Sequence, residues 1–177
     1  MKIVTAIYIC LFTSFYCLST SADSWLPGLQ DRDNTYKFGE LECRLTVKEK
    51  RPKSGWTMPE GTFACKKNGA QVFEKQNLGA DIVVASEDAK YILGISNSGL
   101  HHYAFWIVDL KGKVIAKMTH DSKEIKYCHQ SVTIFRTWFN SVAKPVFVFR
   151  NGSLADITLI SCNESQISLN KLDPFKL

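Results

Sequence analysis

Apolar and polar residues alternate along much of the chain, which indicates β-strands. Residues 41–47 show the pattern most clearly, because every second position is apolar and the positions between them are polar. Side chains on one face of a strand recur at every second residue, so this segment predicts one buried face and one face in water. Residues 103–110 are instead apolar at nearly every position and turn back at Lys111-Gly112.

Turn sequences divide the chain into short strands. Asn68-Gly69 and Asn151-Gly152 each lie between apolar runs, and Asn-Gly accepts the positive φ angles of a two-residue hairpin. The expected strands cover residues 41–47, 62–67, 70–75, 81–85, 90–95, 103–110, 114–118, 131–139, 145–149, 154–160 and 166–169. Of these, residues 131–139 carry bulky groups on both faces and are expected to form a central strand. The polar residues 23–39 are expected to cross the surface as a leader.

The spacing of these turns decides the fold class. Turn sequences recur every 8–12 residues or so, and no stretch keeps a helical period. We therefore expect an all-β fold, an antiparallel sandwich or partly closed barrel of about 8–10 short strands. No linker or repeat divides residues 23–177, which are expected to form a single domain.

The first segment has the layout of a secretory signal. Lys2 precedes an uncharged apolar stretch, and small residues follow at Thr20-Ser21-Ala22. Signal peptidase requires small side chains near the cut, so residues 1–22 are expected to be a signal peptide that is removed. Polar residues interrupt the apolar run, which disfavours a membrane anchor. We expect export to a periplasm or to the extracellular space, with no transmembrane segment after cleavage.

The cysteines point to the same oxidising compartment. After residues 1–22 are removed, Cys43, Cys65, Cys128 and Cys162 remain. An even number in an exported chain indicates two disulfides, for which three connectivities are possible. We favour Cys43–Cys65 and Cys128–Cys162, because each bond then joins nearby segments. The sequence contains no Cys-x-x-Cys pair, which argues against a zinc knuckle or a thioredoxin-like redox site.

The net charge of +5 is a mild basic excess that favours solubility and weak attraction to anionic surfaces. The densest basic cluster consists of Lys48, Lys50, Arg51 and Lys53. It is a candidate site for an anionic ligand, but we favour the simpler interpretation, a solvated loop at the end of a sheet. The expected partner is an anionic surface or another exported protein. Export argues against nucleic acid.

Two parts of the chain resemble known proteins. Residues 85–92 and 107–114 resemble parts of one β-propeller blade, but no second copy of about 40 residues is present, and a propeller needs several. Residues 95–100 and 127–133, with Trp138 and Cys162, are similar to small exported β-domain proteins of bacteria. That resemblance implies a periplasmic location and brings no activity or functional residue with it.

Four histidines are the candidates for metal binding: His101, His102, His120 and His129. A metal site needs three or four converging ligands. His101 and His102 would point to opposite faces of a strand, whereas in a loop both could bind one ion, with His120, Asp121 or His129 completing the set. No ligand-spacing motif links the four histidines. We therefore expect structural or surface roles for them. No catalytic residues are assigned, because no nucleophile elbow or comparable signature is present.

The abundant aromatic residues are expected mostly in the core. In the neighbouring pairs Phe105-Trp106 and Trp138-Phe139, one member is expected to be exposed and available to a ligand. No cofactor motif is found, and no cofactor is expected. The function favoured by the sequence is a non-enzymatic binding or interaction module. The alternative is a small hydrolase or metal-dependent enzyme that uses the histidines.

Overall fold

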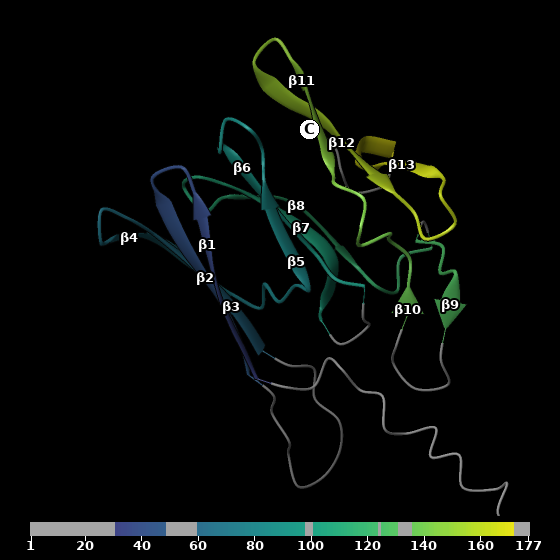
Figure 1. The fold of residues 1–177 in the computed structure, drawn as a ribbon, viewed down its shortest axis with the longest axis horizontal. Coiled ribbons are helices and arrows are strands. Elements are labelled where there is room, and N and C mark those ends of the chain that lie inside the picture. The colour runs from purple at the N-terminus through teal and green to yellow at the C-terminus, as the bar shows by residue number, and fades with distance from the viewer. Residues whose placement is uncertain (1–30, 49–59, 98–100, 124, 131–135, 172–177) are drawn as a thin grey trace, which may run out of the picture.

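The computed structural model describes residues 31–48, 60–97, 101–123, 125–130 and 136–171 (Figure 1). Within these ranges the fold is all-β and antiparallel, with thirteen strands, no α-helix and no closed barrel. The all-β prediction is confirmed, although the strands are more numerous than expected. None of the described segments forms a helix long and hydrophobic enough to span a bilayer.

The first sheet is a four-stranded meander. Its strands, in the spatial order β1-β2-β3-β4, are β1 (Arg32–Phe38), β2 (Leu41–Lys48), β3 (Glu60–Lys67) and β4 (Ala70–Gln76). The expected alternation in β2 is confirmed, because its even-numbered residues face solvent while Cys43 and Leu45 are fully buried. Asn68 and Gly69 connect β3 to β4 with φ angles of 51° and 79°, as the hairpin requires.

The expectation that residues 23–39 form a surface leader is wrong for the part described, because Arg32–Phe38 is an edge strand. This strand pairs with β2 over its whole length. Most of its side chains are polar and exposed, so it lacks the apolar alternation that marks a strand in sequence. Tyr36 and Phe38 nevertheless pack against the core that the first sheet shares with its neighbour.

The middle sheet is buried on both faces. Its strands, in the order β5-β6-β7-β8, are β5 (Ile82–Ala85), β6 (Tyr91–Ile95), β7 (Tyr103–Asp109) and β8 (Val114–Thr119). Side chains of one face, including Ile92 and Trp106, join the core against the first sheet. Those of the other face, including Leu93 and Phe105, join a second core. This double burial explains the continuously apolar sequence of β7.

Trp106 of the middle sheet packs against Phe63 of the first sheet and lies over Gly94 of its own sheet. Trp106 is fully buried, its ring centroid lies 4.9 Å from that of Phe63, and its Nε1 donates a hydrogen bond to the carbonyl of Gly79 at 3.0 Å. Its indole lies over Gly94, the residue opposite it on β6, where a Cβ atom would collide with the ring. Glycine is therefore required at position 94 by this approach.

The third sheet covers the other face of the middle sheet. It contains β11 (Val146–Arg150), β12 (Ser153–Ile160) and β13 (Gln166–Ser168), and a 3₁₀ turn, η1 (Leu169–Lys171), follows it. Asn151 and Gly152 connect β11 to β12 with φ angles of 51° and 77°, which confirms the second predicted hairpin. Ile157 and Leu159 of β12 enter the second core with residues of β6 and β7.

Two very short strands lie beside the third sheet: β9 (His129–Gln130) and β10 (Arg136–Thr137). The central strand expected over residues 131–139 falls partly outside the described residues. Within residues 136–139 it is wrong as a continuous strand, because β10 ends at Thr137 and Phe139 forms only an isolated bridge to Ser161. The bulky side chains of Trp138 and Phe139 reflect burial in the second core and not pairing along a continuous strand.

The aromatic neighbours are not divided between core and surface. Phe105, Trp106, Trp138 and Phe139 are all buried. The expectation that one member of each pair is exposed is therefore wrong. Phe105 and Trp106 point to opposite faces of β7, but the middle sheet is covered on both. Trp138 and Phe139 both enter the second core because the chain leaves strand geometry at this point.

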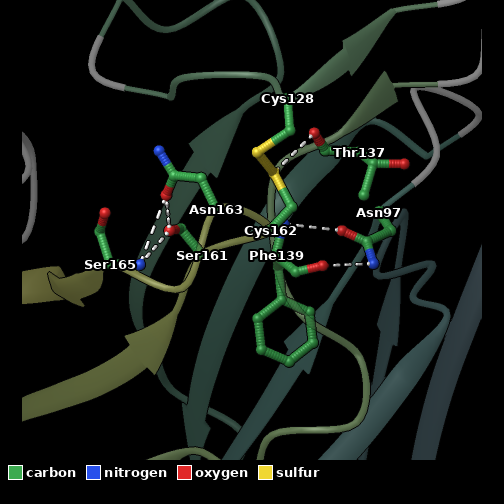
Figure 2. The surroundings of a disulfide bond; sticks show 8 residues. All are labelled: Asn97, Cys128, Thr137, Phe139, Ser161, Cys162, Asn163 and Ser165. Atoms are coloured by element: carbon green, nitrogen blue, oxygen red, sulfur yellow. Dashed lines mark hydrogen bonds between the residues drawn. A yellow bond between two sulfur atoms is a disulfide. The ribbon is translucent and has the colours of Figure 1, made fainter.

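Both favoured disulfides are present, Cys43–Cys65 and Cys128–Cys162. Cys43 and Cys65 are paired residues of β2 and β3, with Cα atoms 4.0 Å apart, and both are fully buried. The second bond ties the segment before β9 to the residue that follows Ser161, with Cα atoms 6.0 Å apart (Figure 2). Cys128 is exposed, so this bond lies at the surface.

Asn97 links the end of the middle sheet to the segment beside the second disulfide. Its Nδ2 donates to the carbonyl of Phe139 at 2.9 Å, and its Oδ1 accepts from the Phe139 amide at 3.0 Å (Figure 2). One side-chain amide thus satisfies both backbone groups of a buried residue. The neighbouring Trp138 Nε1 donates to the carbonyl of Ser96 at 2.7 Å, which strengthens the same connection.

The two disulfides are expected to differ in their reaction with a reductant. A phosphine such as TCEP should reduce Cys128–Cys162 in the folded protein, because Cys128 is exposed, and leave the buried Cys43–Cys65 bond intact until the chain unfolds. Timed alkylation followed by mass spectrometry measures both bonds in one sample. Simultaneous reduction of the two under native conditions would contradict this difference.

Candidate functional site

An apolar groove lies between an edge of the middle sheet and an edge of the third sheet. Its volume is about 450 Å³. The residues that line it are Val84, Ala85, Glu87, Lys144, Pro145, Val146, Phe147 and Phe149. Because β5 and β11 are the outer strands of their sheets, one edge of each strand pairs with no other strand in the described part of the chain. The groove therefore combines apolar surface with available backbone hydrogen-bonding groups.

The second core forms the floor of this groove. Val84, Tyr91 and Phe147 pack against that core and remain partly exposed. The ring of Phe149 lies 6.1 Å from that of Tyr91, so β11 and β6 are in contact at this end of the groove. These contacts connect the two sides of the groove, as expected for a preformed binding site.

The edge strand β11 is unusually apolar for its exposure. Val146 is 58% exposed and Phe149 is 37% exposed, although both are large hydrophobic residues. The longer outer strands of the other sheets carry charged side chains, namely Arg32, Asp33 and Lys37 in β1, Glu74 and Lys75 in β4, and Lys117 in β8. Charged residues on an edge prevent pairing with other chains. Within β11 the only charge is Arg150 at its last position.

Basic side chains mark both ends of β11. Lys144 lies two residues before the strand, Arg150 ends it, and both are exposed. Neither forms a salt bridge with another of the described residues. The groove has one acidic lining residue, Glu87, which belongs to the turn after β5 on the opposite side. The β11 side is therefore apolar along its length and positive at both ends.

A second, polar depression covers the solvent-exposed face of the first sheet. Its volume is about 630 Å³, and charged and hydroxyl side chains line it, among them Asp33, Glu42, Arg44 and Lys66. Arg44 pairs with Asp33 through two hydrogen bonds, and the bond from Arg44 holds the pKa of the Asp33 carboxyl below its usual value. This exposed pair lies within the sheet, as is common on a solvated surface.

His101 belongs to a buried polar group between the first and middle sheets. It is 1% exposed, and its Nε2 lies 3.3 Å from Oδ1 of Asp81. Arg32 donates to the same oxygen at 3.0 Å, and the backbone N–H of Asn97 donates to Oδ2 at 2.9 Å. The ring of His101 lies against Gly79, where a Cβ atom would collide with it. The Asp81 carboxylate thus connects β1, the residue Asn97 after β6 and His101 before β7 in one polar cluster.

The other histidines do not join this cluster. His120 is buried, with Nδ1 3.0 Å from the Tyr127 hydroxyl, whereas His102 is exposed and contacts the Tyr103 ring edge-on. His129 lies in β9. His101 and His120 thus fill packed sites outside the strands, where no periodicity indicates burial, whereas His102 lies at the surface. Among the described residues, no group of three His, Cys, Asp or Glu side chains could hold a metal ion.

The basic cluster expected to bind an anionic ligand is only partly described. Lys48 is the exposed last residue of β2, while Lys50, Arg51 and Lys53 lie outside the described residues. Lys66 and Lys67 are exposed on β3, and Lys67 pairs with Glu40 at 2.6 Å.

The groove is the feature that the sequence reasoning missed. The sequence predicts the strand over residues 145–149 and indicates burial for its phenylalanines, but the strand order that leaves β11 at an edge is not a local property. One local signal exists, because no charge interrupts Pro145–Phe149 while Lys144 and Arg150 flank it.

No protein-family model matches the chain, and neither the curated proteins nor the solved structures include one that is significantly similar to it.

Proposed function

We propose that this chain is an exported, non-enzymatic binding module that holds an apolar part of its ligand in the groove between β5 and β11. The observation that carries this proposal is the exposure of Val146 and Phe149 on an edge strand beside a preformed apolar groove. Leaving large apolar side chains in water sacrifices the stabilisation that burial gives, and exposed apolar patches commonly mark binding sites.

The remaining features support a role outside the cell. Two disulfides stabilise a fold of this kind where no reducing pool breaks them.

The first and middle sheets share one core, and the middle and third sheets share another, so the groove stands on a rigid support. A rigid scaffold with an open apolar site suits reversible binding, since little order has to be gained on association.

The groove is tested with the neutral dye Nile red, whose fluorescence rises in apolar surroundings. We expect the unmodified protein to enhance the fluorescence, and the double variant Val146→Lys/Phe149→Lys to lose most of the enhancement, because two charges then enter the groove. Val142→Lys is the matched control, since Val142 is 90% exposed in the loop before β11 and does not line the groove. Equal losses in the control and the double variant, with both folded, would rule out the groove as the binding site.

Export is tested separately. Thr20-Ser21-Ala22 offers small residues to signal peptidase, so the mature protein should begin at Asp23. N-terminal sequencing of protein collected outside the cytoplasm of an export-competent host gives the answer. Recovery of the exported protein with Met1 still attached would show that no cleavage occurs.

A further inference from the structure

We propose that the open edge of β11 binds an extended segment of another polypeptide that is apolar in the middle and acidic at both ends. This inference rests on the proposed function and names the ligand class of the same groove. An extended chain can add to a sheet edge through its backbone, while its alternate side chains fill pockets beside the edge. β11 offers such an edge, because β12 occupies only one of its sides and the groove lies beside it.

The apolar side chains of β11 define the middle of the ligand. Val146, Phe147, Val148 and Phe149 form an uninterrupted apolar run, and Val146 and Phe149 are exposed. Apolar and β-branched side chains on an added strand would cover this surface as cross-strand neighbours. The partly exposed Val84 and Phe147 provide apolar surface for side chains that point into the groove.

The charges define the ends of the ligand. Lys144 and Arg150 are exposed on either side of the apolar run. An added strand with acidic residues at both ends meets a basic side chain at each end of β11, whether it runs parallel or antiparallel. Glu87, the one acidic residue that lines the groove, belongs to the turn after β5 on the opposite side and not to β11. Complementary charge of this kind selects the partner and speeds its association.

The same charges disfavour a second copy of this chain as the occupant. Symmetric antiparallel pairing of two β11 strands brings the Arg150 end of each copy beside the Lys144 end of the other. Like charges that face each other across paired strands are destabilising. A strand from a different polypeptide, with acidic flanks, avoids this repulsion and gains attraction instead.

The test measures binding of fluorescently labelled synthetic peptides at low salt by anisotropy. The peptide Asp-Glu-Val-Thr-Val-Thr-Val-Glu-Asp should bind at least about tenfold more tightly than a version with lysine flanks. N-methylation of all five residues of its Val-Thr-Val-Thr-Val core should abolish binding, because it removes the amide donors from both edges of the added strand. Equal affinity for acidic and basic flanks, or indifference to N-methylation, overturns the proposal.

Matched charge reversals locate the site. The double variant Lys144→Glu/Arg150→Glu should weaken binding of the acidic peptide by about tenfold and improve binding of the lysine-flanked one. Lys111→Glu/Lys113→Glu is the control, because it changes the charge equally at the exposed turn between β7 and β8. Equal weakening by the two double variants would refute β11 as the site.

Two further results separate this inference from the proposed function. If Nile red binds to the groove but none of the peptides does, the groove remains a binding site and the extended polypeptide ligand is wrong. If light scattering shows a dimer that Val146→Lys/Phe149→Lys converts to a monomer, the occupant is a second copy of the chain, and the acidic segment is likewise wrong.

Discussion

Replacement of Trp106 by alanine should lower the free energy of unfolding by about 3–5 kcal/mol, as expected for a buried tryptophan. Trp106 is fully buried between the first and middle sheets, and its indole occupies the space over Gly94. The carbonyl of Gly79 also loses its hydrogen bond from Nε1. Urea unfolding followed by far-ultraviolet circular dichroism measures the change.

Trp106→Phe separates the two contributions. Phenylalanine keeps much of the contact with Phe63 but cannot donate to Gly79, so its cost should lie well below that of alanine. Val142→Ala changes an exposed side chain and should leave the unfolding free energy within about 0.5 kcal/mol of the original. A cost for Trp106→Ala as small as that control would show that this contact does not hold the two sheets together.

Removal of the Cys43–Cys65 disulfide by the double variant Cys43→Ala/Cys65→Ala should cost at least about 3 kcal/mol. The bond closes a segment with a sequence separation of 22, which in the chain-entropy model is worth roughly this amount. The two cysteines are also fully buried in the core between the first and middle sheets, so alanine leaves unfilled space there. Non-reducing urea unfolding gives the difference from the unmodified protein.

Cys128→Ala/Cys162→Ala is the comparison for this effect. Its sequence separation of 34 predicts a slightly larger entropic term, but Cys128 is exposed and its replacement leaves no buried space. The first double variant should therefore be at least as destabilised as the second. A clearly larger cost for the Cys128 and Cys162 variant would mean that burial of the first disulfide contributes nothing to stability.

Local sequence patterns were enough to predict most strands, for two physical reasons. The alternation of β2 reflects one buried face and one exposed face, and each Asn-Gly pair specifies a hairpin without reference to the rest of the chain. Proximity along the chain favoured the correct disulfides, since each joins segments that are neighbours in space. These features depend on residues close together in sequence.

The incorrect expectations concern properties that depend on distant parts of the chain. β1 is held by pairing with β2 rather than by an apolar face, so its sequence resembles a loop. Phe105 and Trp106 are both buried because separate sheets cover the two faces of β7. Predicting the groove requires the order of strands within two sheets. Predicting the surroundings of His101 requires knowing that Gly79 lies against its ring. No local periodicity carries that information.

The division of the fold into three meanders has a consequence for how the chain folds as it is synthesised. Each sheet is built from consecutive strands, so the first sheet can form before the later strands have left the ribosome. The middle sheet follows and gains cover for one face, where Ile92 and Trp106 pack. Its other face, which includes Leu93 and Phe105, stays uncovered until β11–β13 arrive. During that interval the partly synthesised chain exposes apolar surface that the complete fold buries, and it is then most prone to aggregation.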